Sequence, residues 1–397
     1  MKWANPGGAL SSLRVIDLSQ VRAGPTCIKQ FADFGADVIK VEPPDSVPRG
    51  ELYVGARDGA DMQNLHRNKR SITLNLKSPR AREVLEPLLK TADLVVENFR
   101  PNVKERLGLD YGTLSQLNPR LVLVSISGFG QDGPYRDRPG FDQIIQGMCG
   151  LMSATGMPDG PPLRAGASVV DVAAGLYAAL GAMTALLERA HSGKGQWVQA
   201  SLLHVGIGLM DYQAARYLTD GAVAQRVGND HPTSMPTSSY PTADGYLNIG
   251  AGGDEMWRRL CGALGRPELA DDSEFLTDPD RSRNRSRLNA ILGDIFRTAT
   301  TAEWSRRLAQ ADVPSGPIYT MDQVFADPQV QHARIAAPLD HPRRGRIHVV
   351  DQVVKLERTP AHVAMPLEDK GGSNDDVLAE LGLSVQAVAE LRAQQVI

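Results

Sequence analysis

Short apolar runs alternate with helical stretches through the first third of the chain. Runs rich in Val, Ile and Leu, which predict buried strands, occupy residues 13–18, 36–41, 71–76, 93–97 and 121–126. Apolar residues at helical spacing predict helices between them, up to residue 34 and over residues 79–91. Strands separated by helices predict an α/β fold, in which a parallel sheet is covered by helices on both faces.

Ligands of such sheets bind beyond the carboxyl ends of the strands. We therefore expect the functional site near residues 19–24, 97–99 and 127–133, each of which follows a predicted strand. The segment 128–133 matches the pattern GxGxxG, but Pro134 follows it and no helix is predicted to begin there. We interpret it as a turn or as a glycine-rich active-site loop.

The longest apolar stretch, residues 169–187, consists largely of Ala and Gly and is interrupted by Asp171. A membrane span needs about 20 strongly apolar residues, so this stretch is interpreted as a buried helix. A second long helix is predicted over residues 202–218, and a strand over 245–249 opens a later, mainly helical unit. Two short helices are predicted near the C-terminus. A chain of 397 residues with this pattern is expected to form two domains.

Composition narrows the class of protein. The 43 Lys and Arg residues nearly balance the 46 Asp and Glu residues, and the net charge of −3 argues against a dedicated nucleic-acid binder. Cys27, Cys149 and Cys261 are spaced too widely for a zinc site or a disulfide framework. His66 and His204 have no paired nucleophile and are expected to be core or solvated residues. The N-terminal residues hold no apolar segment typical of a secretory signal. We expect a cytoplasmic protein without a metal site, a membrane or a nucleic-acid partner.

Asp171 is the most informative residue, because it lies where a strand-like Ser-Val-Val gives way to a helix. Burying an unpaired charge is costly, so this carboxylate must be paired, hydrogen-bonded or exposed in a cleft. Free N–H groups at a helix N-terminus would keep it ionised, as a nucleophile requires, whereas the alternative is a structural N-cap. The small neighbours Ala173, Ala174 and Gly175 leave room for a ligand and favour the functional interpretation.

A basic stretch accompanies this aspartate in an otherwise acidic chain. Residues 66–106 contain ten Lys and Arg against five Asp and Glu, a net charge of +5. The helix-face residues Arg80, Arg82 and Lys90 are interpreted as solvated. The flanking clusters, Arg67, Lys69 and Arg70 before a strand and Arg100, Lys104 and Arg106 after one, suit either phosphate binding or a solvated surface.

Six motifs occur in an order that resembles family III CoA-transferases, of the formyl-CoA, carnitine and dicarboxylate CoA-transferase type. They are residues 21–25 (VRAGP), 35–42 (GADVIKVE), 68–71 (NKRS), 97–101 (ENFRP), 139–142 (PGFD) and 193–196 (GKGQ). The resemblance runs from about residue 10 to the C-terminus, and the combination of motifs is far more specific than any one of them.

The resemblance implies an interlocked homodimer with a Rossmann-like large domain and a smaller α+β domain. The large domain would comprise residues 1–200, completed by about 335–397. A linker helix at 201–226 would lead to the small domain at 227–330.

The resemblance also implies a reaction and a site. Asp171 would be the catalytic residue, forming an aspartyl anhydride and an aspartyl-CoA thioester while CoA moves from an acyl-CoA to a free carboxylate, with no permanently bound cofactor. The residues implied to contact CoA are Arg22, Ala23, Leu74, Lys77, Asn98, Phe99, Arg100 and Arg106. In the implied arrangement Arg22 lies near Asp171, which leaves open whether it binds CoA or a second carboxylate on the substrate.

Departures from the family pattern bear on the acceptor. Residues 250–253 are shorter than the glycine loop of formyl-CoA transferase, Pro43 and Pro44 replace an arginine of some relatives, and residues 371–374 (GGSN) replace Gly-Glu-His. An α-methylacyl-CoA racemase is one alternative, but that branch has a histidine where Phe141 precedes Asp142. A non-catalytic CoA-binding protein is the other, and it would not need Asp171.

Overall fold

The computed structural model of the chain describes residues 8–47 and 55–397. Residues 1–7, to which the expectation of no secretory signal refers, lie outside the described part. By its internal contacts the chain divides into a larger unit of Met1–Leu151, Arg164–Ala222 and Gln331–Ile397 and a smaller unit of Met152–Leu163 and Val223–Val330. These bounds differ from the expected ones in two places. Residues 152–163 pack with the smaller unit, and most of the expected linker helix packs with the larger one.

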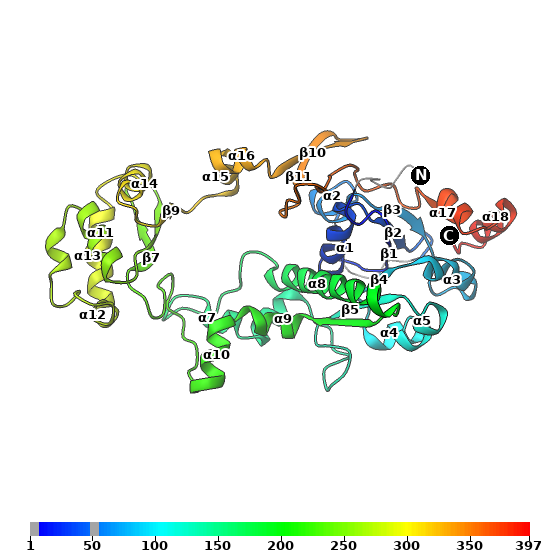
Figure 1. Cartoon of the computed structure of the whole chain (residues 1–397), viewed down its shortest axis with the longest axis horizontal. Coiled ribbons are helices and arrows are strands. Elements are labelled where there is room, and N and C mark those ends of the chain that lie inside the picture. The colour runs from blue at the N-terminus through cyan, green and yellow to red at the C-terminus, as the bar shows by residue number, and fades with distance from the viewer. Residues whose placement is uncertain (1–7, 48–54) are drawn as a thin grey trace. The chain divides into compact units, whose positions relative to one another are not determined.

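The larger unit is built on a six-stranded sheet whose neighbouring strands are all parallel (Figure 1). The strands are β1 (Arg14–Asp17), β2 (Asp37–Glu42), β3 (Arg70–Thr73), β4 (Leu94–Glu97), β5 (Val122–Ser127) and β6 (Trp197–Ser201). Their order is β3-β2-β1-β4-β5-β6, so the strand order reverses between β1 and β4. The carboxyl ends of these two strands therefore mark the place where a parallel sheet binds its ligand.

Successive residues of each strand face opposite sides of the sheet and enter two separate cores. Val15 packs in a cluster with α1 (Ala23–Asp33) and α8 (Val169–Ser192). Ile16 packs in a second cluster with α3 (Arg82–Thr91), α17 (Asn374–Glu380) and α18 (Val385–Ala393). The predicted parallel sheet with helices on both faces is confirmed.

Further short helices connect these elements. They are α2 (Ala60–His66), the 3-10 turn η1 (Pro79–Ala81), α4 (Pro101–Arg106), α5 (Tyr111–Leu117), α6 (Asp142–Met148), α9 (Leu202–Leu209) and α10 (Asp211–Asp220), with α7 (Leu151–Ala154) and α16 (Pro328–Ala333) spanning the unit boundaries in sequence. The helix predicted over 202–218 is thus divided at Met210. The strand predicted over 71–76 ends at Thr73, and residues 74–76 leave the sheet to line a cavity.

The end of the chain completes the larger unit. Arg70 of β3 forms ion pairs of 2.7 Å with both Asp37 of β2 and Glu380 of α17. The sequence analysis missed the antiparallel hairpin of β10 (Ala336–His341) and β11 (Gly345–Val350). Only alternate residues of β10 are buried, and Pro338 interrupts the apolar pattern that would have indicated a strand.

Helix α8 is only half buried, which corrects the prediction of a buried helix. It has the length and hydropathy of a membrane span, but its face of Ala and Gly packs against α1, β5 and β6. Its opposite face exposes Val172, Leu176, Leu180, Met183 and Leu187, which follow one another at helical spacing.

The smaller unit has its own core. Its antiparallel sheet comprises β7 (Thr237–Pro241), β8 (Tyr246–Gly250) and β9 (Ser315–Pro317), and its helices are α11 (Asp254–Ala263), η2 (Pro267–Ala270), α12 (Asp278–Arg283), α13 (Arg285–Phe296), α14 (Thr301–Gln310) and α15 (Met321–Ala326). Trp257 and Trp304 are buried at the centre of this core, together with Phe275 and Phe296. The unit therefore has the mixed α and β content that was expected.

Candidate active site

A buried carboxylate holds the loop that follows β1. Asp17 accepts hydrogen bonds from the backbone N–H of Ser19 at 2.9 Å and from its hydroxyl at 2.6 Å. Lys69 donates to the same carboxylate at 2.9 Å, and Lys40 donates to the carbonyl of Ser19 at 3.3 Å. Although burial opposes ionisation, the charges of Lys40 and Lys69 hold the pKa of Asp17 below its usual value. The ionised group therefore fixes the backbone at the carboxyl end of β1.

The loops after β1 and β4 are joined to each other. The side chain of Asn98 exchanges hydrogen bonds with both backbone polar groups of Gln20, at 2.9 and 2.8 Å. Between Gln20 and α1, Val21 adopts φ of 61°, a left-handed conformation that β-branched residues rarely take. Such strain persists only where surrounding contacts impose it, and it often marks a functional site. The sequence carried no signal for this conformation.

Asp171 is the third residue of α8, and the N-cap position is occupied by Ser168. The carboxylate of Asp142 accepts hydrogen bonds from the backbone N–H of Val170 at 3.0 Å and of Asp171 at 3.2 Å. Asp142 therefore takes the capping role that the sequence analysis offered as the alternative for Asp171. Among the described residues the Asp171 carboxylate has no hydrogen-bonded partner.

Burial and, secondarily, the negative charge of Asp142 raise the pKa of Asp171 to about 6, while the charge of Arg22 acts in the opposite direction. The backbone N–H groups of Val170 and Asp171, at the start of the helix, bind Asp142 and not this carboxylate. At neutral pH a carboxyl group with this pKa is still mainly ionised, and it is a better nucleophile for being poorly solvated.

The small residues after Asp171 serve helix packing. A Cβ atom on Gly175 would lie 2.5 Å from the carbonyl oxygen of Ala23 and 2.7 Å from the Cβ of Thr26. Ala174 and Gly175 are buried against α1, so the space that the sequence suggested for a ligand is occupied by that helix. The close approach brings the start of α1, with Arg22 and Ala23, to the start of α8.

Asp171 lies in a cavity of about 310 Å³ at the carboxyl end of the sheet. Its other lining residues include five of those implied to contact CoA: Arg22, Ala23, Asn98, Phe99 and Arg100. Gly128, which follows β5, and Phe141 also line this cavity. The predicted site regions after β1, β4 and β5 therefore meet in one place.

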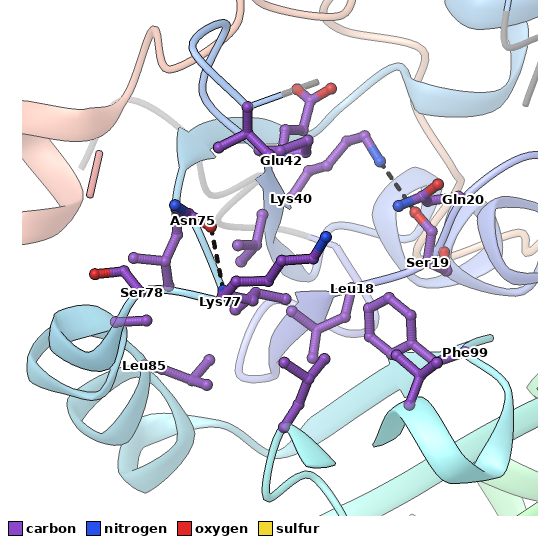
Figure 2. Close-up of a pocket in the computed structure, with 18 of the residues that line it drawn as sticks. Leu18, Ser19, Gln20, Lys40, Glu42, Asn75, Lys77, Ser78, Leu85 and Phe99 are labelled. Carbon is purple, nitrogen blue, oxygen red and sulfur yellow. Dashed lines mark hydrogen bonds between the residues drawn. The ribbon is translucent and has the colours of Figure 1, made fainter. Parts of the chain in front are cut away.

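A second, larger cavity of about 730 Å³ adjoins the first, since Gln20, Val21 and Phe99 line both. It contains the remaining residues of the predicted set, Leu74, Lys77 and Arg106. Figure 2 shows Lys77 reaching into this cavity from the segment after β3, with Phe99 on the opposite side. Apolar walls with cationic side chains suit a long ligand that carries phosphates.

Comparisons with known proteins agree with this geometry. The sequence profile of CoA-transferase family III matches residues 10–367. The chain belongs to CoA-transferase family III. It is 39% identical to the succinate–glutarate CoA-transferase of Agrobacterium fabrum, over 94% of this chain and 95% of that protein. It is 37% identical to the succinyl-CoA–D-citramalate CoA-transferase of Chloroflexus aurantiacus over the full length of both.

A solved structure supports the fold over nearly the whole chain. A CAIB/BAIF family protein from Brucella suis has a TM-score of 0.83 and 34% identity, and the match covers 94% of this chain and all of that one. Its membership of this family identifies the protein as an enzyme that transfers CoA between acyl groups.

Several basic residues of this CoA-transferase are buried and line neither cavity, so they fit neither the phosphate-binding nor the solvated interpretation of the flanking clusters. Arg67 forms a 2.7 Å ion pair with Asp33, and both side chains are fully buried. Lys69 is paired with Asp17 and Arg70 with Asp37. Lys104 is buried beside Glu97 and donates to Ser125 and Gln131. These buried residues stabilise the structure around the site without lining it, whereas Arg100 and Arg106 line the cavities.

Several lining residues were not predicted, among them Lys40 of β2 and Arg82 of α3. The side chain of Arg82 is 61% exposed, as its solvated interpretation requires, and it also lines the larger cavity. Pro43, one of the departures from the family pattern, also lines it. By contrast, Asn374 of the departing GGSN segment hydrogen-bonds the backbone N–H and the hydroxyl of Thr73 at 2.8 Å each, so that departure stabilises the end of β3.

The two histidines considered in the sequence analysis, His66 and His204, lie in different environments. His66 is buried at the wall of the larger cavity, and its Nδ1 accepts a hydrogen bond from the Lys69 ammonium at 3.2 Å. Burial holds its pKa well below the usual value, so it is neutral and fits the core interpretation. His204 is exposed on α9. Within residues 8–47 and 55–397, no group of His, Cys, Asp and Glu side chains has the arrangement of a metal site.

Proposed function

We propose that Asp171 is the nucleophile that carries CoA from an acyl-CoA thioester to a free dicarboxylic acid. The observation that carries the proposal is the position of Asp171 in a cavity that shares lining residues with the larger, cation-lined cavity. A CoA molecule in the larger cavity, contacting Leu74, Lys77 and Arg106, would extend its thioester past Phe99 towards Asp171. Arg22, Ala23, Asn98 and Arg100 line the route on which the acyl end would lie.

The reaction consists of four exchanges at one carboxyl group. The Asp171 carboxylate attacks the thioester carbonyl, the C–S bond breaks, and CoA leaves as a thiolate from an acyl-aspartyl anhydride. The thiolate attacks the aspartyl carbonyl and releases the donor carboxylate, which leaves an aspartyl-CoA thioester. The acceptor carboxylate then displaces the thiolate to form a second anhydride. Attack of the thiolate on the acceptor carbonyl gives the new acyl-CoA and restores Asp171.

The overall reaction converts one CoA thioester into another of similar energy, so no external energy source is needed. Water must be excluded, because anhydrides and thioesters hydrolyse. The glycine-rich segment 128–133, whose Gly128 lines the Asp171 cavity, is proposed to close over the reacting groups.

A dicarboxylic substrate is supported by the relatives, which are named for succinate, glutarate and citramalate. The racemase alternative needs a second base beside the substrate carbon. Phe141, which precedes Asp142 and lines the Asp171 cavity, offers none, and no histidine appears among the described residues that line this cavity.

We also propose a homodimer whose contact includes the exposed apolar stripe of α8, because Leu176, Leu180 and Leu187 would otherwise face water. The strand order of the sheet is that of Rossmann folds and supports a Rossmann-like description of the larger unit. All three cysteines are free and buried, which suits a reducing compartment such as the cytoplasm.

The decisive experiment traps the covalent intermediate. Enzyme incubated with succinyl-CoA is treated with hydroxylamine, which would convert an activated Asp171 into a hydroxamate that mass spectrometry locates. Asp171→Ala should abolish both the adduct and CoA transfer while CoA binding is retained. Undiminished transfer by this variant would refute the proposal.

A further inference from the structure

Arg22 lines the cavity that contains Asp171. The side chain begins at the N-cap of α1, and α1 packs closely against α8, so the two residues line the same 310 Å³ space. The charge of Arg22 acts on Asp171 strongly enough to oppose the rise in its pKa. No other cation among the described residues acts on Asp171 to a comparable extent.

The structure already shows Arg22 holding a carboxylate. Nη1 and Nη2 of Arg22 donate to Oδ1 and Oδ2 of Asp61 in α2, at 3.2 and 2.5 Å. A guanidinium has five N–H donors, and this end-on fork uses two of them. Nε makes no hydrogen bond with the described residues, so the edge that it forms with a neighbouring amino group remains available.

The Arg22–Asp61 pair is partly exposed, with 30% and 59% of the two side chains accessible. Ion pairs in such exposed positions contribute little to stability. Asp61 therefore orients Arg22 without tying up its binding capacity, and a second anion can share the guanidinium at little cost.

The other arginines of the cavity are less suited to this role. Arg136 forms ion pairs with Glu105 and Asp137. Arg138 stacks on the ring of Tyr135, with 3.8 Å between its guanidinium carbon and the ring centre. Arg100, the N-cap residue of α4, also lines this cavity, but it is not among the charges that act on the pKa of Asp171.

We propose that Arg22, oriented by Asp61, binds the distal carboxylate of a dicarboxylic substrate while Asp171 reacts at the proximal one, and so selects dicarboxylic over monocarboxylic acids. The proposal rests on the function proposed for Asp171. It assigns Arg22 to the substrate and not to CoA, the question that the sequence left open.

The test compares two acyl groups of four carbons that differ in the distal carboxylate. Exchange of labelled succinate into succinyl-CoA and of labelled butyrate into butyryl-CoA is measured for the wild type, Arg22→Gln, Arg22→Lys and Arg138→Gln. Identity exchange uses the same acid as donor and acceptor, so each rate reports one acyl group only. CoA affinity is measured in parallel by calorimetry.

In the wild type, kcat/KM should favour the succinyl exchange. Arg22→Gln should reduce the succinyl-to-butyryl ratio on the order of 10- to 100-fold, which corresponds to one lost charge-assisted hydrogen-bonded contact. Arg22→Lys keeps the charge but loses the two-pronged guanidinium, so its succinyl-to-butyryl ratio should lie between those of the wild type and Arg22→Gln. Arg138→Gln, which removes a charge from the same cavity, should leave the ratio within about threefold, well below the cost of one charged hydrogen bond.

Equal loss of both exchanges in Arg22→Gln, with weakened CoA binding, would overturn the proposal and assign Arg22 to CoA, while leaving the Asp171 chemistry intact. A similar change of ratio in Arg138→Gln would also overturn it, because general positive charge would then explain the preference. Absence of any exchange in the wild type would instead refute the function on which the proposal rests.

Discussion

The side-chain amide of Asn98 binds both backbone polar groups of Gln20, with its oxygen accepting from the N–H at 2.9 Å and its nitrogen donating to the carbonyl at 2.8 Å. This pair joins the loops that follow β1 and β4, between which the strand order of the sheet reverses. Gln20 lines both cavities, so one amide holds the wall that they share.

Replacing this amide should weaken CoA binding more than it lowers the stability of the fold. Asn98→Leu keeps a similar volume and removes two hydrogen bonds, each of which contributes about 1 kcal/mol. We expect CoA affinity, measured by calorimetry, to fall about 10-fold, because the loops must then be ordered by the ligand. Asn118→Leu is the matched control, since Asn118 binds the carbonyls of Leu89 and Ala92 and lines neither cavity. It should lower thermal stability and leave CoA affinity unchanged. The reverse pattern would contradict the assigned role.

The pH profile of the activity should have an acidic limb, a fall in rate at low pH, that is set by Asp171. Its pKa is raised to about 6, so the nucleophilic form is lost as the pH falls through that value, and kcat/KM for acyl-CoA should decline there. Asp142→Asn removes the negative charge of Asp142, a lesser cause of the rise, and should move the limb to lower pH. An asparagine oxygen can still accept from the N–H groups of Val170 and Asp171.

The hydrogen bond from Gln146 to Asp142 must rearrange in that variant, so its thermal stability is recorded as well. A folded Asp142→Asn enzyme whose limb stays at the wild-type pH would exclude Asp142 as a cause of the shift.

The same pKa predicts how stability depends on pH. The folded state raises the pKa of Asp171 from 3.8 to about 6, so it binds more protons than the unfolded state between these values. The stability present at low pH is therefore lost as the pH rises through 6. Asp171→Asn stays neutral, and its melting temperature should exceed that of the wild type at pH 7–8 by a margin that shrinks towards pH 4. Exposed Asp159, changed to Asn, is the control for removing one negative charge. A margin independent of pH would contradict the assignment.

The dimer proposal is tested on the exposed face of α8. Leu180 is 61% exposed at the middle of the apolar stripe. Burying a leucine contributes about 1.5–3 kcal/mol, and a symmetric contact loses it twice, so Leu180→Asp should raise the dissociation constant on the order of 100-fold or more. Analytical ultracentrifugation at micromolar concentration measures the shift. Val385→Asp, at an 89% exposed position on α18, should leave the association unchanged. A wild-type protein that sediments as a monomer would refute the proposal.

The order of strands and helices in the larger unit follows from local pattern. Val15 and Ile16 are apolar in sequence because each enters a different core, and a run buried on both faces is visible without a structure. Asp171 was recognisable for the same reason, as a charge inside an apolar run. The residues implied to contact CoA were found through ordered motifs, and all of them line the two adjoining cavities.

Ion pairs between residues far apart in the chain could not be predicted from the sequence, because the partner of a charge depends on which strands become neighbours. Lys69 and Arg106 are both basic residues next to predicted strands, yet one is buried on Asp17 and the other lines a cavity. Composition likewise could not show that Asp142 caps α8, or that Gly175 serves the contact with α1 and not a ligand. The sequence by itself indicated the class of fold and singled out Asp171 as the carboxylate that we propose to react. Tertiary structure decided which charges are neutralised by burial and which remain free to bind, because that depends on contacts between residues far apart in the chain.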